Sequence, residues 1–299
     1  MKVTVSLVLG SGGARGYAHI GVIEELERRG YRIKAIAGSS MGALIGGLYA
    51  AGSLADYRDW VLGLKRIDIL RLMDVTFTRG AIRGERVFAR LRELVGDPLI
   101  ETLPIAFTAV ATDLAHQKEV WFQSGPLLEA VRASVAVPGF FTPVVKDNRV
   151  LVDGGVLNPL PIIPTVAAHA DIIVAVDLNT SRYRMPVVDM PQNVYLDHPG
   201  LSDEGPPERK AKDAEQAARN QKERFAGRMD IILSSVEAMQ SSLGEYKIAG
   251  YPPDLTINVP KEAGSFYEFH RAAEMIELGR EIARERLALL EQGRPVEEY

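Results

Sequence analysis

Gly38-Ser39-Ser40-Met41-Gly42 is the stretch on which the predicted fold depends. It follows an apolar, strand-like run at residues 33–37 and precedes a run of small residues at 43–51 that is typical of a helix. A strand, a sharp Gly-x-Ser-x-Gly turn and a helix form the context of a nucleophile elbow, which exposes the serine above the edge of a sheet. Ser40 is therefore the candidate nucleophile.

The two flanking glycines of this stretch have a physical reason to be there. A strained strand-to-helix turn crowds the backbone on either side, so a Cβ at Gly38 or Gly42 would clash. The pentapeptide alone leaves a second interpretation open, in which Ser40 is only the N-cap of a helix that follows a strand.

Length and composition exclude several classes of protein. A chain of 299 residues with 46% hydrophobic and 25% charged residues can bury a large core, as one large α/β domain or two small ones. The net charge of −4 does not favour a nucleic-acid partner. The absence of cysteine excludes disulfides, thiolate chemistry and cysteine-ligated zinc.

The N-terminus shows no targeting signal. It enters a strand at once, without the apolar core and cleavage site of a signal peptide. No apolar run reaches the ~18 residues of a membrane-spanning helix. We expect a cytoplasmic protein, with peripheral contact at the inner membrane surface as a further option.

Hydrophobic periodicity predicts an α/β protein. The opening order of strand, helix, strand, helix is typical of a parallel sheet with helices on its faces. No repeat or second domain boundary is visible, so we expect one domain over 1–299. The predicted strands are 3–9, 33–37, 105–111, 119–122, 150–152, 172–176 and 255–259; the predicted helices run from 17 to 30 and over 43–51, 127–137, 158–169, 229–246 and 268–290.

Two regions have distinctive charge patterns. Residues 54–88 read as helical, and from 65 to 86 basic residues alternate with apolar ones, which fits either a lid on an anionic surface or, as we favour, a solvated helix pair. Residues 180–228 are rich in proline and then in mixed charges, which predicts a polar loop and an exposed helix, with a flap as the alternative. Residues 229–299 form a mostly helical C-terminal part.

The glycine-rich loop at residues 10–16 has two interpretations. A dinucleotide site would need a third glycine and an acid at the end of the second strand, and both are missing, so nucleotide binding is disfavoured. The other interpretation is an oxyanion hole, in which the successive N–H groups of Gly12, Gly13 and Ala14 stabilise a developing negative oxygen. Neighbouring parallel strands would bring this loop beside Ser40.

A nucleophilic serine also needs a base. Each histidine is more plausibly structural or exposed than catalytic, because none lies in a late strand-to-helix loop. Asp113, Asp153 and Asp177 each follow a strand, and Asp153 is the best candidate because Gly154 and Gly155 let its backbone approach another turn closely. The histidines considered are His19, His116, His169, His198 and His270.

Several motifs in order resemble the patatin-like phospholipases, in the bacterial branch related to neuropathy target esterase. They are the loop at 10–16, the elbow at 38–42, the run at 134–143 and Asp153-Gly154-Gly155, all within about residues 3–180. Ser11 departs from the pattern, since the family usually has glycine there, but a serine still offers an N–H.

The resemblance implies a three-layer α/β/α fold with a mostly parallel central sheet. It implies a Ser40–Asp153 dyad that hydrolyses phospholipid, lysophospholipid or related lipid esters through an acyl-enzyme, without a metal or cofactor. The predicted oxyanion hole comprises Gly12, Gly13, Ala14 and Arg15; the Arg15 side chain is either a brace, which we favour, or a cation near a lipid phosphate. A regulatory scaffold that acts through a protein partner is the alternative function, and the oligomeric state is open.

Overall fold

The computed structural model describes residues 2–72, 75–76, 81–82, 84–180 and 228–293. Most of the polar stretch predicted at 180–228 therefore lies outside the described residues. No helix in the described ranges is both long enough and apolar enough to cross a membrane.

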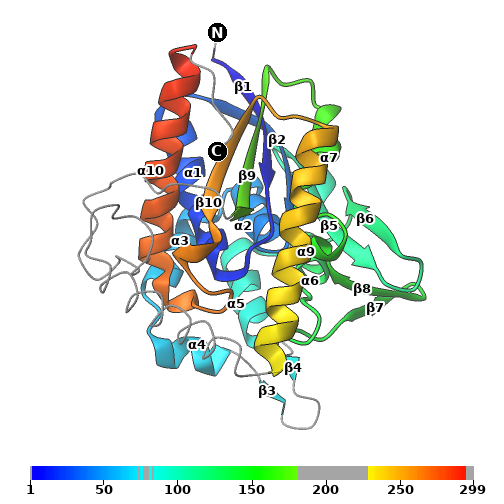
Figure 1. The fold of residues 1–299 in the computed structure, drawn as a ribbon. Coiled ribbons are helices and arrows are strands. Elements are labelled where there is room, and N and C mark those ends of the chain that lie inside the picture. Colours follow the sequence, from blue (N-terminus) through cyan, green and yellow to red (C-terminus); the bar gives the residue numbers. More distant parts are fainter. Residues whose placement is uncertain (1, 73–74, 77–80, 83, 181–227, 294–299) are drawn as a thin grey trace, which may run out of the picture.

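A central sheet organises the described part of the chain (Figure 1). Its strand order is β10-β9-β1-β2-β5-β8-β7, and β6 pairs with β5. The strands β10, β9, β1, β2 and β5 are mutually parallel, whereas β6, β8 and β7 join in antiparallel pairs. The mostly parallel sheet is thus confirmed. The strands are β1 (Thr4–Leu9), β2 (Arg32–Ser39), β5 (Ala106–Asp113), β6 (Lys118–Phe122), β7 (Val144–Lys146), β8 (Arg149–Asp153), β9 (Ile172–Thr180) and β10 (Leu255–Pro260).

Helices cover both faces of this sheet and complete the three predicted layers. The larger core lies on one face, where α1 (Ala18–Arg28), α2 (Met41–Ala50) and α10 (Ala272–Glu291) bury the apolar side chains of β1 and β2. A smaller core lies on the opposite face under α7 (Ile163–Val166) and α9 (Arg228–Gly250) (Figure 1). Alternation of side chains along the strands supplies apolar residues to both cores.

Two helix predictions are wrong over much of their length. Residues 54–88 are not continuously helical, because α3 (Leu54–Leu62) and α4 (Arg66–Leu72) are separated from α5 (Glu85–Val95) by the hairpin strands β3 (Val75–Thr76) and β4 (Ala81–Ile82). The β-branched residues of β3 favour extended backbone. The helix expected at 158–169 is reduced to α7, because prolines at 159 and 161 disfavour helical backbone before them. Strand β7 and α6 (Leu127–Ser134) complete the differences, the first unpredicted and the second shorter than expected.

Helices α1 and α10 cross at very close range. A Cβ placed on Gly279 would lie 2.1 Å from the carbonyl oxygen of Ala18, and one on Gly21 would lie 1.9 Å from that of Ile276. Real Cβ atoms do not approach backbone so closely, so the crossing requires glycine on both helices.

We expect Gly279→Ala to lower the free energy of unfolding by about 1–3 kcal/mol, because the added methyl forces the two helices apart. Urea unfolding of the purified protein measures this change. Gly250→Ala, at a helix end with no atom within 4 Å of the added carbon, is the matched control. Equal stability of the two variants would contradict the account of the crossing.

Candidate active site

Ser40 lies in a strained turn between β2 and α2. Its φ of 56° and ψ of −124° are unusual for a residue with a side chain. A Cβ on Gly38 would lie 2.3 Å from the Gly42 carbonyl oxygen, and one on Gly42 would lie 2.0 Å from the Leu9 carbonyl oxygen. Only glycine at both positions lets α2 begin this close to β1, and this is the crowding expected of an elbow.

Ser134 braces the elbow from α6. The Ser40 N–H donates to Ser134 Oγ at 2.9 Å, and Ser134 Oγ donates to the Val110 carbonyl at 2.6 Å. Ser134 is fully buried. Sequence reasoning assigned it no role, because a contact between residues 94 positions apart leaves no local signal.

Asp153 lies level with Ser40, at the end of a strand that runs antiparallel to β5. Strand β5 pairs Val110 with Ser39 of β2, and its next residue, Ala111, pairs with Asp153 of the antiparallel strand β8. The carboxylate is buried, and its Oδ1 accepts the Gly155 N–H at 2.7 Å. The turn formed by the glycines that follow Asp153 therefore binds the Asp153 carboxylate.

Burial dominates the electrostatics of Asp153. Loss of water around the carboxylate raises its pKa to about 7, against the opposing effects of the Ser40 hydroxyl and the Gly155 N–H. Within the described structure, Asp153 Oδ2 is buried and makes no hydrogen bond of standard length and angle.

The glycine-rich loop lies beside the elbow, but one predicted donor is already engaged. A Cβ on Gly16 would contact Met41, the residue after the nucleophile, at 2.3 Å. The Ala14 N–H donates to the Phe266 carbonyl at 2.8 Å, so its prediction as a free oxyanion donor is wrong. No acceptor among the described residues takes the N–H of Gly12 or Gly13, and these two remain candidate donors.

Arg15 lies inside the protein rather than at a lipid-facing surface. Its fully buried guanidinium donates to the carbonyls of Lys261 and Gly264 at 3.1 Å each, to Asn179 at 3.2 Å and to Glu237 at 2.9 Å. These contacts tie the glycine-rich loop to the C-terminal part of the chain. They support the bracing role and exclude the alternative of a guanidinium free to meet a lipid phosphate.

The described histidines serve structural contacts. His19 is buried and its Nε2 lies 2.9 Å from the Gly10 carbonyl oxygen. Burial lowers its pKa to about 4, so the ring is neutral at pH 7 and Nε2–H donates to that carbonyl. His116 pairs with Asp113, and His270 contacts Arg66. His169 is at a turn with φ of 48°, and His198 lies outside the described residues.

The two remaining carboxylates are committed elsewhere. Asp113 contacts His116 at 2.8 Å and Arg149 at 3.8 Å, away from the elbow. Asp177 accepts the Asn179 N–H at 2.9 Å, and burial raises its pKa. In the part of the chain that the structure describes, no three histidine or carboxylate side chains gather to hold a metal ion.

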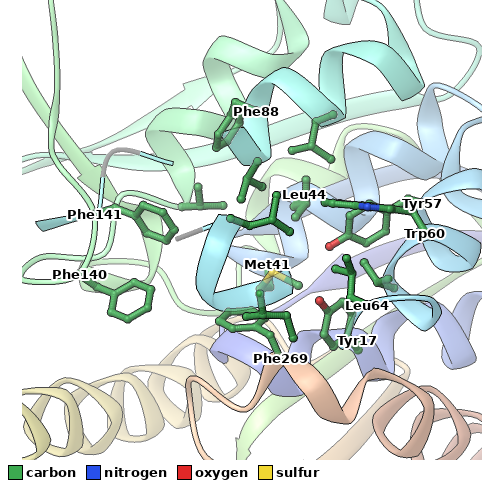
Figure 2. Close-up of a pocket in the computed structure, with 16 residues that line it drawn as sticks. Tyr17, Met41, Leu44, Tyr57, Trp60, Leu64, Phe88, Phe140, Phe141 and Phe269 are labelled. Carbon is green, nitrogen blue, oxygen red and sulfur yellow. The ribbon is translucent and has the colours of Figure 1, made fainter. Parts of the chain in front are cut away.

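An apolar cavity of about 110 Å³ lies next to the elbow (Figure 2). Met41 and Leu44 enter its lining from α2, directly after Ser40. Burial raises the pKa of Tyr17 and Tyr57 well above the usual value, so both hydroxyls stay protonated. The lining residues are Tyr17, Met41, Leu44, Tyr57, Trp60, Val61, Leu64, Ile69, Leu72, Val87, Phe88, Leu91, Val135, Phe140, Phe141 and Phe269.

This cavity corrects the interpretation of residues 54–88. Ile69 and Leu72 of α4 and Phe88 of α5 face into the cavity, so the region is one of its walls and not simply a solvated helix pair. Lys65 and Arg66 are exposed on the outside of this wall, while positions 79 and 83 lie outside the described residues.

Asp153→Asn should change stability in a pH-dependent way. The folded-state pKa of about 7 lies above the ordinary 3.8, so the folded protein binds the extra proton and loses stability as pH rises from about 4 to 7. The Asn variant lacks this loss. Its stability relative to the wild type should increase by roughly 2–4 kcal/mol over this range and stay level above it.

Urea unfolding at pH 5 and pH 8 measures this difference. Asp97→Asn, at an exposed carboxylate, is the control and should show no comparable change. A constant difference between the Asp153→Asn variant and the wild type across this range would show that the carboxylate has an ordinary pKa.

Comparison with known proteins identifies the family of this chain. The family model described as patatin-like phospholipase matches residues 7–166. Uncharacterized NTE family proteins of Mycobacterium tuberculosis and Mycobacterium bovis are each 41% identical, covering 96% of this chain and 92% of theirs.

More distant matches have lower sequence identity and cover less of their own length. The lysophospholipase nte1 of Emericella nidulans is 32% identical over 59% of this chain and 12% of its own length. The solved structure of VipD from Legionella pneumophila aligns with 96% of this chain and 67% of its own at 16% identity and a TM-score of 0.46. The chain therefore belongs to the NTE-related, patatin-like phospholipase family, which supports its assignment as a lipid hydrolase.

Proposed function

We propose that the protein is a serine acyl hydrolase that cleaves the carboxylic ester bonds of phospholipids, lysophospholipids or related lipid esters. The observation that carries this proposal is the pairing of a strained, buried Ser40 with a buried Asp153 whose Oδ2 has no standard hydrogen bond in the described structure. Strain of this kind persists where the surrounding structure enforces it, and it is concentrated at functional sites.

In the first step, Ser40 Oγ attacks the ester carbonyl carbon and Asp153 takes the hydroxyl proton. A pKa near 7 makes this carboxylate a stronger base than an exposed aspartate at neutral pH. The carbonyl oxygen becomes negative and is stabilised by the N–H groups of Gly12 and Gly13. The carbon–oxygen bond to the alcohol then breaks, and Asp153 returns the proton to the departing alcohol.

In the second step, water releases the acyl group from Ser40. Asp153 removes a proton from the attacking water, and the resulting tetrahedral species collapses to the fatty acid and free Ser40, which regains its proton. The same carboxylate thus acts as base and acid in each half of the reaction. No other titratable side chain is needed for the proton transfers.

The apolar cavity supports a lipid acyl chain as the group that is transferred. Its walls are almost entirely aliphatic and aromatic, and it begins at the residue next to the nucleophile. Burying an acyl chain there would gain about 0.8 kcal/mol for each CH₂ removed from water. Contact with an anionic lipid surface stays a prediction, supported by Lys65, Arg66 and Ile67, which are exposed on the outer side of the cavity wall.

The alternative of a regulatory scaffold has less support. A scaffold that acts through a partner needs neither a strained Ser40 nor a buried carboxylate beside it, and each of these costs stability.

Ser40→Ala should lower hydrolysis of a lipid ester panel by about 10³-fold or more, because it removes the hydroxyl that forms the acyl-enzyme. It should also abolish labelling by a fluorophosphonate probe, which reports the nucleophile directly. Ser242→Ala, on the exposed side of α9, is the matched control and should retain both. The proposal would be contradicted if the wild-type protein neither reacted with the fluorophosphonate probe nor hydrolysed any ester of the panel.

The pH dependence of kcat/KM should show an acidic limb near pH 7. Asp153 acts as a base only when ionised, so the rate should fall about tenfold for each pH unit below its pKa of about 7. Steady-state hydrolysis of a soluble short-chain ester between pH 5 and 9 measures this limb. A rate that is constant down to pH 5 would exclude Asp153 as the base at its assigned pKa.

A further inference from the structure

Helix α9 packs on the face of the sheet opposite α1 and α10 (Figure 1), and its polar side contacts the glycine-rich loop and β6. Glu237, Gln240 and Lys247 are spaced three and seven residues apart, which places them on one side of a helix. Glu237 accepts a hydrogen bond from Arg15 of the glycine-rich loop, and Lys247 donates to Glu119 of β6 at 2.7 Å. The apolar residues at 232, 239 and 246 are exposed on the other side.

Gln240 occupies the middle of this polar side and meets the turn that follows Asp153. It is 4% exposed. A Cβ on Gly155 would lie 2.5 Å from Gln240 Nε2 and 2.8 Å from Ser11 Oγ, so the two side chains close over the same glycine. The N–H of Gly155 is the group that donates to Asp153 Oδ1.

The polar atoms around this glycine are unusual. Ser11 Oγ, Gln240 Oε1 and Asp153 Oδ2 are all buried without a standard hydrogen bond in the described part of the chain. A buried polar atom left in this state costs roughly 1–3 kcal/mol. A methionine would fill the space of Gln240 without that cost, so stability alone does not explain an amide at this position.

We propose that Gln240 is a positioning residue for Asp153. Its amide and the Ser11 hydroxyl hold the Gly155 peptide between them, so that the Gly155 N–H engages Oδ1 and Oδ2 stays directed to Ser40. Gln240 lies outside the segment that the family model matches, so this role belongs to the C-terminal part of the chain. The inference rests on the proposed function.

The charged groups near this contact are paired with other partners. Arg15 and Glu237 bond to each other, and Lys247 bonds to Glu119. Asp177 accepts the Asn179 N–H, and it is influenced by Arg15 and Glu245. Burial, Ser40 and Gly155 set the pKa of Asp153. A new charge at position 240 would therefore act on Asp153 across Gly155.

Two substitutions of similar size test the role. Gln240→Met should lower kcat about tenfold or more with KM unchanged, since small displacements of a catalytic group cost this much or more. Its thermal midpoint should equal or exceed that of the wild type. Gln240→Glu should move the acidic limb of kcat/KM to higher pH, because a second carboxylate disfavours ionised Asp153. Met239→Glu adds the same charge on the exposed side and should match the wild type.

The proposal would be overturned if the acidic limb of kcat/KM in Gln240→Glu coincided with the limbs of the wild type and Met239→Glu. It would also be overturned if Gln240→Met had the same kcat as the wild type. Should Gln240→Glu not fold, Gln240→Met decides alone. Failure of the proposed function is a distinct outcome, in which the wild-type protein does not hydrolyse esters. In that case urea unfolding as a function of pH replaces the kinetic measurement. The pH range over which the protein loses stability should move upward in Gln240→Glu but not in Met239→Glu.

Discussion

The close contact between the start of α2 and the end of β1 is the constraint on which the site depends. Gly42 lies against the Leu9 carbonyl so tightly that a Cβ has no room, and Ser40 is held at a positive φ as a result. The same contact brings the glycine-rich loop that follows β1 to the side of the nucleophile. One packing requirement thus fixes the backbone of the serine and brings the glycine-rich loop close to it.

The second requirement is a carboxylate that is buried but not fully neutralised. Asp153 enters from β8, which runs against the parallel strands and ends where β2 ends. Asp177, near the end of the parallel strand β9, accepts the Asn179 N–H just as Asp153 accepts the Gly155 N–H, so each carboxylate binds an N–H two residues further along the chain. The strand is what distinguishes Asp153, because the antiparallel end of the sheet places this buried carboxylate, whose pKa is raised to about 7, at the level of Ser40.

The C-terminal part of the chain holds the glycine-rich loop in place. Arg15 extends from the glycine-rich loop to the carbonyls of residues 261 and 264 and to Glu237 of α9. Phe266 takes the Ala14 N–H, which removes one predicted donor but anchors the loop. The candidate catalytic loops lie within the first 155 residues, whereas contacts from the last third of the chain hold the glycine-rich loop in position.

The sequence by itself determined the order of the main strands and helices and the glycine-flanked turn at Ser40, whereas the choice of Asp153 among three acids as the base stays a prediction. Glycine spacing, β-branched runs and helix periodicity act over a few residues and can be read locally. The tertiary structure alone decided that Ala14 is engaged, that Ser134 and Gln240 reach the site, and that α4 and α5 wall the cavity. These features depend on contacts between distant segments, and a linear pattern cannot show which buried donors and side chains will meet.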